Sequence, residues 1–585
     1  MATAVPGQQT DKDLASIAEA RALARRAKAA QAILAEFSQA QVDAIVDAMA
    51  AAVTPQAEVL ARLAVEETGF GVVADKTQKN LFASQRVLEF IRPIKTVGVI
   101  HRNDEKKVIE IAEPFGVVAA VIPSTNPTST AIYKILISIK ARCAVVLTPH
   151  PAAARCITCT ADIMNEAGRR AGLPDGAIGW MRTVTLEGTQ ELMKAREVAV
   201  ILATGGMGLV RAAYSAGKPA YGVGPGNAPC YIESSADVRK AANDILIGKS
   251  FDNGVLCSSP NSVVVDQAIE AEARRQFLDQ GGYFLSAAEA DALGKQLVTP
   301  QRLPNPAFVG KSASFIAQQV GITVPPGTRA LIAELKGVGR DFPLSFEKLC
   351  PVLSYYVVKD WREACERCKA ILRYGGMGHT MSIHSQNDAI ILEFGLHKPA
   401  YRICVNTPTT HGSIGLTTGL DPAMTLGCGG FGGNITSDNI TPRHLINIKR
   451  VAYELRPASV PRVLTVPEVP KASFEKAVPS SASLPKAPAK PALETIGTAT
   501  LTNRIDRFLA SRGLGTKPME PLERVERLEP AKPSEPEQFV CEDDVRLAVK
   551  EGRKLLIGER TIVTPSARDA GEAGKIFLYA GWPSS

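Results

Sequence analysis

The sequence lacks the long apolar run that a membrane-spanning helix needs. No stretch of its 585 residues approaches the ~18 to 20 uninterrupted apolar residues that cross a bilayer. Its first residues, MATAVPGQQTDKDLASIAEA, also lack the basic and then apolar layout of a secretory signal. We therefore expect a cytoplasmic protein with no membrane partner.

Dense positive charge is also missing. A net charge of +8 is mild for this length, and no basic block is interleaved with aromatic residues. The sequence therefore gives no indication of nucleic-acid binding. The eleven cysteines of a long cytoplasmic chain indicate free thiols and not a disulfide framework. Two C-x-x-C pairs, Cys156/Cys159 and Cys365/Cys368, lie in helical patterns and not in the turns of a zinc site, so we expect no metal.

What is present indicates an α/β protein of more than one folded unit. The chain is too long for a single core. From Gly116 onward, short β-branched runs alternate with helix-like segments. The expected parallel strands are GVVAAVIPS, CAVVLTPH, EVAVILATGG and PAYGVGPG. This alternation predicts a doubly wound α/β sheet, and a second α/β unit follows from about 235.

The ends of the chain have a different composition. Residues 12–52 are Ala-rich with helical spacing, and 95–113 resembles a β-hairpin turning at Asn103 and Asp104. After about 456 the chain is rich in Pro, Ser, Ala and Lys, which is typical of a solvated linker. The expected divisions are 1–234, 235–425, 426–455, a linker at 456–497, an amphipathic helix at 498–512, a second linker at 513–537 and a small tail segment at 538–585.

The segment that carries most chemical information is SFDNGVLCSSPNSVVV, residues 250–265. Cys257 lies in a Gly-containing turn just before a β-branched run, which can present a sulfur at a cleft. A lone cysteine is more often a buried, inert thiol, because reactivity needs a thiolate stabilised by backbone N–H groups or positive charge. Its wider context favours the reactive interpretation.

That context resembles the aldehyde dehydrogenase superfamily over about residues 12–455, with five motifs in the family's order. Besides the nucleophile loop, these are PSTNPTST (123–130), LATGGMGLV (202–210), GVGPGNAP (222–229) and FEKLCPVL (346–353). The resemblance implies an aldehyde dehydrogenase-like fold: a doubly wound cofactor domain within 1–234, a catalytic domain at 235–425, and a β oligomerisation arm formed by 95–113 and 426–455. A flexible C-terminal extension follows.

The same resemblance implies roles for individual residues. Cys257 would be the nucleophile, Asn126 the oxyanion-binding amide, and Glu347 the carboxylate that holds the nicotinamide ribose. On spacing alone, the glycine-rich segments fit a tight structural turn equally well, since neither is G-x-G-x-x-G with a later acidic residue. The further residues that the resemblance places at the cofactor are Thr125, Pro149, His150, Thr204, Gly205, Gly206 and Gly224.

IPSTNPTSTAIYK, TPHPAAARC, GVGPGNAP and GHTMSIHS are most similar to the coenzyme A-acylating branch, which includes the propionaldehyde and acetaldehyde dehydrogenases of bacterial microcompartments. Hydrolytic relatives carry a glutamate base where this chain, aligned on Pro229, has Val223. Without that base, a coenzyme A thiol is the better acceptor of the acyl group. The resemblance thus implies NAD-dependent oxidation of a short aldehyde, with NADP left open. His379 and His384 fit substrate contacts or structural histidines equally well.

Two alternatives remain open at this stage. A hydrolytic aldehyde dehydrogenase would release free acid, and a non-catalytic scaffold would act through the region after 456. The arm resembles an oligomerisation arm, so we expect a homodimer or a dimer of dimers. In 498–512, Leu501, Ile505, Phe508 and Leu509 share one helical face. The resemblance implies an encapsulation peptide for microcompartment shell proteins, with docking on the chain's own core as the alternative.

Overall fold

The computed structural model describes residues 6–299, 303–456, 537, 539–558 and 561–579. The chain divides into two compact units, Met1–Pro461 and Arg462–Ser585, and each is described by itself. The amphipathic segment predicted at 498–512 lies outside the described residues, as do nearly all residues of the two predicted linkers.

A five-stranded parallel sheet of order β5-β4-β3-β6-β7 forms the first half of the larger unit. The strands are β3 (Val117–Ile122), β4 (Val145–Pro149), β5 (Ile178–Trp180), β6 (Val198–Thr204) and β7 (Ala220–Val223). The four strands predicted from the apolar runs are therefore confirmed as β3, β4, β6 and β7, and the order confirms a doubly wound sheet.

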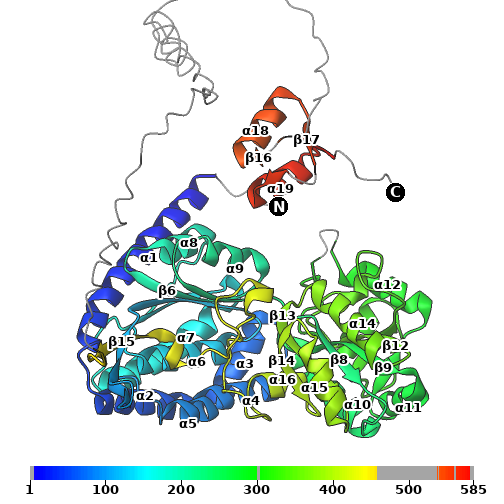
Figure 1. Ribbon diagram of the computed structural model, residues 1–585, viewed down its shortest axis with the longest axis horizontal. Coiled ribbons are helices and arrows are strands. Elements are labelled where there is room, and N and C mark those ends of the chain that lie inside the picture. Colours follow the sequence, from blue (N-terminus) through cyan, green and yellow to red (C-terminus); the bar gives the residue numbers. More distant parts are fainter. Residues whose placement is uncertain (1–5, 300–302, 457–536, 538, 559–560, 580–585) are drawn as a thin grey trace, which may run out of the picture. The chain divides into compact units, whose positions relative to one another are not determined.

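Helices cover both faces of this sheet because its central strand is apolar on both sides. Val118, Ala120 and Ile122 of β3 join one core cluster, and the alternating Val117, Ala119 and Val121 join another. Figure 1 shows α8 and α9 on one side of β6 and α6 and α7 on the other. The helices are α1 (Pro6–Leu34), α2 (Gln39–Val53), α3 (Ala57–Thr68), α4 (Val73–Leu81), α5 (Val87–Ile91), α6 (Pro127–Lys140), α7 (Ala154–Arg170), α8 (Leu186–Lys194) and α9 (Met207–Tyr214).

A seven-stranded parallel sheet of order β10-β11-β12-β9-β8-β13-β14 forms the second half. Its strands are β8 (Ala228–Ile232), β9 (Pro260–Asp266), β10 (Gly282–Phe284), β11 (Ala330–Glu334), β12 (Val352–Val358), β13 (Gly378–His384) and β14 (Ala400–Val405). Its helices are α10 (Val238–Ser250), α11 (Glu270–Asp279), α12 (Ala287–Leu297), α13 (Ala313–Gln319), α14 (Trp361–Arg373), α15 (Asp388–Leu396) and α16 (Thr409–Ser413).

The change from the first sheet to the second occurs between β7 and β8. β8, which begins at Ala228, pairs with β9 and β13 and not with the first sheet, so the second sheet begins before the expected division at residue 234. Both C-x-x-C pairs lie on helices, α7 and α14, as their spacing predicts.

A separate antiparallel sheet of order β1-β2-β15 makes an arm. The residues of the expected hairpin form β1 (Gly98–Asn103) and β2 (Val108–Pro114), and Asn103 Oδ1 accepts a hydrogen bond from the Lys106 N–H in the turn, at 2.8 Å. β15 (Ile446–Ala452) pairs with the outer edge of β2, so the chain returns to the hairpin after the second sheet.

The smaller unit has a core of its own. Val540, Val545, Ala548, Leu555 and Ile557 are among its buried residues. Its elements are β16 (Phe539–Val540), α18 (Glu542–Glu551), β17 (Leu555–Ile557), β18 (Ile562–Val563), α19 (Pro565–Ala573) and β19 (Phe577–Tyr579). The strands pair in parallel, β16 with β18 and β17 with β19.

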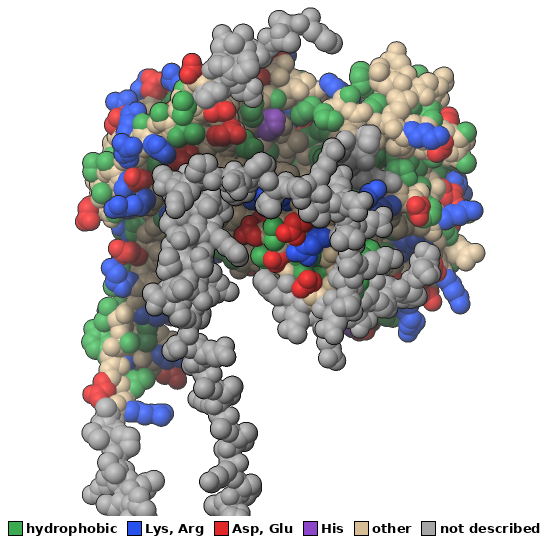
Figure 2. All heavy atoms as spheres, turned by 90° about the horizontal axis from the view of Figure 1, so that it is seen from above, with side chains coloured by type: hydrophobic (Ala, Val, Ile, Leu, Met, Phe, Trp, Pro, Cys, Tyr) green, Lys and Arg blue, Asp and Glu red, His purple; other side chains and the backbone are tan. Residues whose placement is uncertain are grey.

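Two observations bear on the membrane and nucleic-acid functions considered above. Of the described residues, one run of helices, Gln39–Thr68, has the length and hydropathy of a membrane span. It includes α2 and α3, and apolar residues of both, such as Ile45 and Leu60, belong to the protein core. On the face shown in Figure 2, Lys and Arg side chains are mixed with Asp and Glu side chains over the described part of the chain.

Candidate active site

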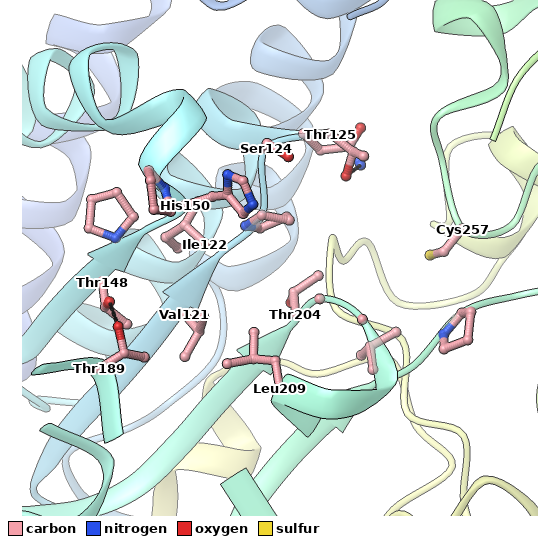
Figure 3. Close-up of a pocket in the computed structure, with 18 of the residues that line it drawn as sticks. Val121, Ile122, Ser124, Thr125, Thr148, His150, Thr189, Thr204, Leu209 and Cys257 are labelled. Carbon is pink, nitrogen blue, oxygen red and sulfur yellow. Dashed lines mark hydrogen bonds between the residues drawn. The ribbon is translucent and has the colours of Figure 1, made fainter. Parts of the chain in front are cut away.

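One pocket of about 510 Å³ opens where β3, β4 and β6 end. In a doubly wound sheet this carboxyl edge is where ligands bind. The ten residues to which the resemblance gave catalytic or cofactor roles all line it: Thr125, Asn126, Pro149, His150, Thr204, Gly205, Gly206, Gly224, Cys257 and Glu347. Figure 3 shows Cys257 on one side of the pocket and Thr148, Thr189 and His150 on the other.

Cys257 reaches the pocket from the turn before β9. The preceding residues Asp252 and Asn253 have left-handed φ values of 50° and 52°, which bend the chain sharply after α10. Gly226, in the glycine-rich segment, packs against the nucleophile loop. A Cβ atom there would lie 2.0 Å from the Cys257 carbonyl oxygen, so only glycine permits this approach.

The surroundings of Cys257 hold it in the thiol form. Burial, followed by the Glu347 carboxylate and Cys428, raises the pKa of Cys257 to about 12, and the Arg402 guanidinium opposes this rise. The thiolate that a nucleophile needs is therefore scarce at neutral pH in this state. A positive charge or a base that arrives with the ligands would activate the sulfur.

Asn126 lies at the start of α6 with φ −134° and ψ 56°, half-buried at the pocket wall. Its side-chain oxygen accepts a hydrogen bond from Lys79 Nζ at 2.5 Å. Its side-chain nitrogen donates to Thr125 Oγ1 at 3.2 Å, which uses one of its two hydrogens. The other hydrogen is available to a ligand in the pocket.

Glu347 is hydrogen-bonded to the glycine-rich segment. The Gly226 N–H donates to Glu347 Oε1 at 2.9 Å. Burial raises the pKa of Glu347 to about 8, against the opposing effects of that N–H and of Lys249 and Lys348. The carboxyl group is thus mostly protonated at pH 7, and a hydroxyl donor would favour its charged form.

The turn after β6 fits the phosphates of a dinucleotide. Gly206 caps α9, so the first N–H groups of this helix face the pocket region where Thr204, Gly205 and Gly206 lie. Thr204 Oγ1 is buried and has no hydrogen-bond partner among the described residues, as expected of a group that a ligand satisfies. Two further wall segments carry predicted cofactor residues: Pro149 and His150 at the end of β4, and Gly224 after β7.

Val223 ends β7 beside Thr204 of β6 and is buried at the pocket wall. It occupies the position at which the sequence pattern lacks a glutamate. Among the residues that line the pocket, Glu347 is the only carboxylate. The pocket therefore offers no carboxylate at position 223 to activate a water molecule.

The structure distinguishes His379 from His384, whose roles the sequence left open. His379 is buried on β13, and its ring would lie 3.3 Å from a Cβ at Gly226, next to the nucleophile loop. Its Nδ1 is 3.0 Å from Thr380 Oγ1, and burial, together with Arg402, lowers the pKa of His379 to about 3, so the ring is neutral. His384 lies at the other end of β13, with Nδ1 3.9 Å from Asp244 on α10.

Lys79 was missed by the sequence analysis. The buried residues of α4 are Lys76, Lys79 and Asn80, so this short helix turns a polar face inward. Helices usually turn their apolar side chains inward, and buried lysines need polar partners. This reversed pattern in α4 was the signal that could have indicated Lys79. Among the described residues, no group of three or more His, Cys, Asp and Glu side chains is placed to hold a metal ion.

Known proteins resemble this chain over its larger unit. Residues 8–281 match the Aldehyde dehydrogenase family. The chain is 42% identical over 442 residues to the bifunctional aldehyde-alcohol dehydrogenase of Escherichia coli (strain K12), a match that covers 75% of this chain and 50% of that protein. The chain thus spans about half the length of the curated relatives of this kind.

Solved structures extend the likeness to the fold. An acetylating aldehyde dehydrogenase from Geobacillus thermoglucosidasius has a TM-score of 0.75 and 49% identity, covering 77% of this chain and 99% of that one. A propionaldehyde dehydrogenase from the fucose utilisation bacterial microcompartment of Clostridium phytofermentans has a TM-score of 0.67 and 29% identity, covering 74% and 96%. The matched family, the near-complete coverage of these chains and the pocket at the sheet edge lead to one conclusion: this chain belongs to the aldehyde dehydrogenase family.

Proposed function

We propose that this protein oxidises a short aliphatic aldehyde to its acyl-coenzyme A thioester with NAD⁺ as hydride acceptor, propionaldehyde being favoured and acetaldehyde possible. The observation that carries the proposal is the meeting of Cys257, Asn126 and Glu347 in one pocket that has Val223 in place of a hydrolytic base. The acetylating relative from Geobacillus thermoglucosidasius supports the acyl transfer, and the Clostridium phytofermentans relative supports the choice of propionaldehyde.

The chemistry of the first half-reaction rests on Cys257. Its thiolate adds to the aldehyde carbon, and the carbonyl π electrons move to the oxygen. The free Asn126 side-chain N–H and the backbone N–H of Cys257 stabilise that oxyanion, each donor contributing ~3 to 4 kcal/mol. Bound NAD⁺ would supply the hydride acceptor. Collapse of the oxyanion with loss of hydride leaves an acyl thioester on Cys257.

The second half-reaction transfers the acyl group to coenzyme A and regenerates the Cys257 thiolate. A coenzyme A thiolate attacks the acyl carbon, and the Cys257 thiolate leaves as the new thioester forms, so one C–S bond is exchanged for another. Because thioester exchange is nearly balanced in energy, the same residues support reduction of acyl-coenzyme A. Thr204, Gly206 and Glu347 would hold the pyridine nucleotide, through the α9 N-terminus and the buried carboxyl.

The deciding experiment compares NADH formation with and without coenzyme A. We expect steady-state turnover of propionaldehyde, acetaldehyde and butyraldehyde to require coenzyme A, with propionaldehyde fastest, and to give acyl-coenzyme A as product. The same assay with NADP⁺ tests the cofactor. Full turnover without coenzyme A, with free acid as product, would establish the hydrolytic alternative instead.

Val223→Glu should raise the share of acyl-enzyme lost to water. The new carboxylate would stand where hydrolytic relatives carry their base, at a wall position next to Thr204. The gain depends on placement within about 0.5 Å, so we expect a several-fold rise in free propionate relative to propionyl-coenzyme A. Val223→Gln is the matched control, since it has the same size without a base. Equal ratios in the two variants would contradict the argument from the missing glutamate.

We also propose that the protein is a homodimer or a dimer of dimers built through its arm. The β1-β2-β15 sheet leaves apolar side chains exposed, namely Val99, Ile448, Val451, Tyr453 and Leu455 on or next to its strands. Exposed apolar groups on an open sheet edge indicate a partner surface. Light scattering at micromolar concentration should give two or four times the chain mass of 62.2 kDa. The pair of substitutions Ile448→Asp and Val451→Asp should reduce it, and a wild-type monomer refutes the proposal.

The segment 498–512 is proposed as an encapsulation peptide that binds microcompartment shell proteins. Its apolar face of Leu501, Ile505, Phe508 and Leu509, between two Pro-rich stretches, supports coupled folding and binding. A fluorescent protein fused to 498–512 should form foci only in cells that assemble shells. Ile505→Ser with Phe508→Ser is the control peptide. Diffuse fluorescence with assembled shells rejects the proposal, as does loss of dehydrogenase activity on truncation at about residue 460.

A further inference from the structure

The side-chain amide of Asn126 can stabilise an oxyanion only in one of its two orientations. The oxyanion needs the nitrogen, which donates, and not the oxygen, which accepts. The two orientations occupy the same volume, so packing alone does not select between them. The neighbours that hydrogen-bond to the amide must make the selection.

Lys79 is the neighbour that can make this selection. Its Nζ lies 2.5 Å from Asn126 Oδ1. An ammonium group has three donors and no acceptor, so a flipped amide would place its N–H₂ group against another donor. Thr125 Oγ1, which accepts from the amide nitrogen at 3.2 Å, is a hydroxyl that could donate or accept and so tolerates either orientation. Lys79 therefore fixes the orientation and Thr125 does not.

A buried carboxylate keeps Lys79 in place. Asp252 is fully buried and forms ion pairs with Lys79 and, at 3.0 Å, with Lys76, and both lysine side chains are 2% exposed. The Val72 N–H donates to Asp252 Oδ1 at 2.7 Å, so the carboxylate itself is held from α4's start. Burial lowers the pKa of Lys79 to about 8 against the opposing effect of Asp252, so the ammonium form depends on this pair.

We propose that Lys79 is a positioning residue, which holds the Asn126 amide with its N–H toward the oxyanion. The inference rests on the proposed function, since it assumes that Asn126 binds the oxyanion. Asp252 lies on the turn that leads to Cys257, so one buried charge cluster positions both the oxyanion donor and the nucleophile loop. The positively charged Lys79 ammonium, which donates to the amide oxygen, also polarises the amide N–H bond and strengthens it as a donor.

A double-mutant cycle tests this directly, with the single-turnover rate of NADH formation as the readout. Lys79→Met removes the charge and keeps the length of the side chain, while Asp252 keeps Lys76 as a partner. We expect Lys79→Met to slow the wild-type enzyme ~10-fold and the Asn126→Ala enzyme less than about twofold, because without the amide there is nothing to orient. The KM for NAD⁺ should change little in either background.

Lys76→Met is the matched control. Lys76 has the same burial and the same ion pair, but its Nζ donates to the Thr125 carbonyl at 2.9 Å and not to the amide. Its effect on the rate should be the same factor with and without Asn126. The proposal would be overturned if Asn126→Ala reduced the rate effect of Lys76→Met as much as it reduced that of Lys79→Met. The effect on the rate would then belong to the charge cluster as a whole.

The outcomes separate this inference from the function on which it rests. A near wild-type rate for Asn126→Ala alone removes the oxyanion role itself. A slow Asn126→Ala enzyme that Lys79→Met slows by the full ~10-fold leaves that role intact and overturns only the positioning by Lys79. Thermal unfolding establishes that each variant is folded, and if Lys79→Met is not, Lys79→Gln enters the same cycle under the same criterion.

Discussion

Cys257→Ala should abolish both aldehyde oxidation and acyl-coenzyme A reduction. Both directions pass through a thioester on this sulfur, so the loss should be to background and not partial. The fold should survive, because the side chain is half-buried at the pocket surface and its replacement removes one sulfur atom. NADH formation with propionaldehyde and coenzyme A, and NADH consumption with propionyl-coenzyme A, measure the two directions.

The control is another partly exposed thiol. Cys159 lies on α7 and is half-buried like Cys257, but it does not line the pocket. Cys159→Ala should retain activity. A Cys257→Ala enzyme that oxidises aldehyde near the wild-type rate would rule out covalent catalysis at this position, whatever the pocket contains.

The pKa of Cys257 adds a pH dependence to this prediction. Alkylation of the ligand-free thiol should be slow at neutral pH and rise about tenfold for each pH unit toward its pKa of about 12. The Glu347 carboxylate raises that pKa, so its removal in Glu347→Gln should speed alkylation above pH 8, where Glu347 is ionised.

The site residues were assigned through the resemblance of five motifs to the aldehyde dehydrogenase superfamily, and not through local pattern alone. Asn126 and Thr204 lie where β3 and β6 end, at the carboxyl edge of the first sheet, whereas Cys257 precedes β9 of the second sheet. Local pattern was sufficient only for strands such as β3, β4, β6 and β7, which are short buried runs rich in β-branched residues.

What the sequence could not provide depends on pairing between distant segments. β8 is a short buried strand like the strands before it, and only its pairing with β9 and β13 assigns it to the second sheet. Lys79 meets Asn126 across 47 residues and Asp252 across 173 residues, with no motif to link them. The sequence predicted a small segment at 538–585 but not its elements, since its strands have only two or three residues and give almost no periodic signal.

Asn126→Ala should lower the single-turnover rate of NADH formation by ~10² to 10³, the cost of one oxyanion donor. Lys79 loses its acceptor in this variant but keeps its ion pair with Asp252, so the folded state should persist. The KM for NAD⁺ should change much less than the rate, because the cofactor segment is the separate turn of Thr204, Gly205 and Gly206. A change in that KM alone would make Asn126 a cofactor contact.

Asn126→Asp distinguishes a lost donor from lost packing. The aspartate has the size of asparagine and one oxygen in the place of Oδ1, so it can keep the contact with Lys79 Nζ and gain an ion pair with it. Its second oxygen would face the developing oxyanion without a hydrogen to donate. The variant should therefore be at least as thermally stable as the wild type and yet lose at least the ~10² to 10³ of Asn126→Ala. An Asn126→Asp enzyme that remains fast would show that the amide N–H contributes nothing to the transition state, and the oxyanion would then have to rest on backbone N–H groups alone.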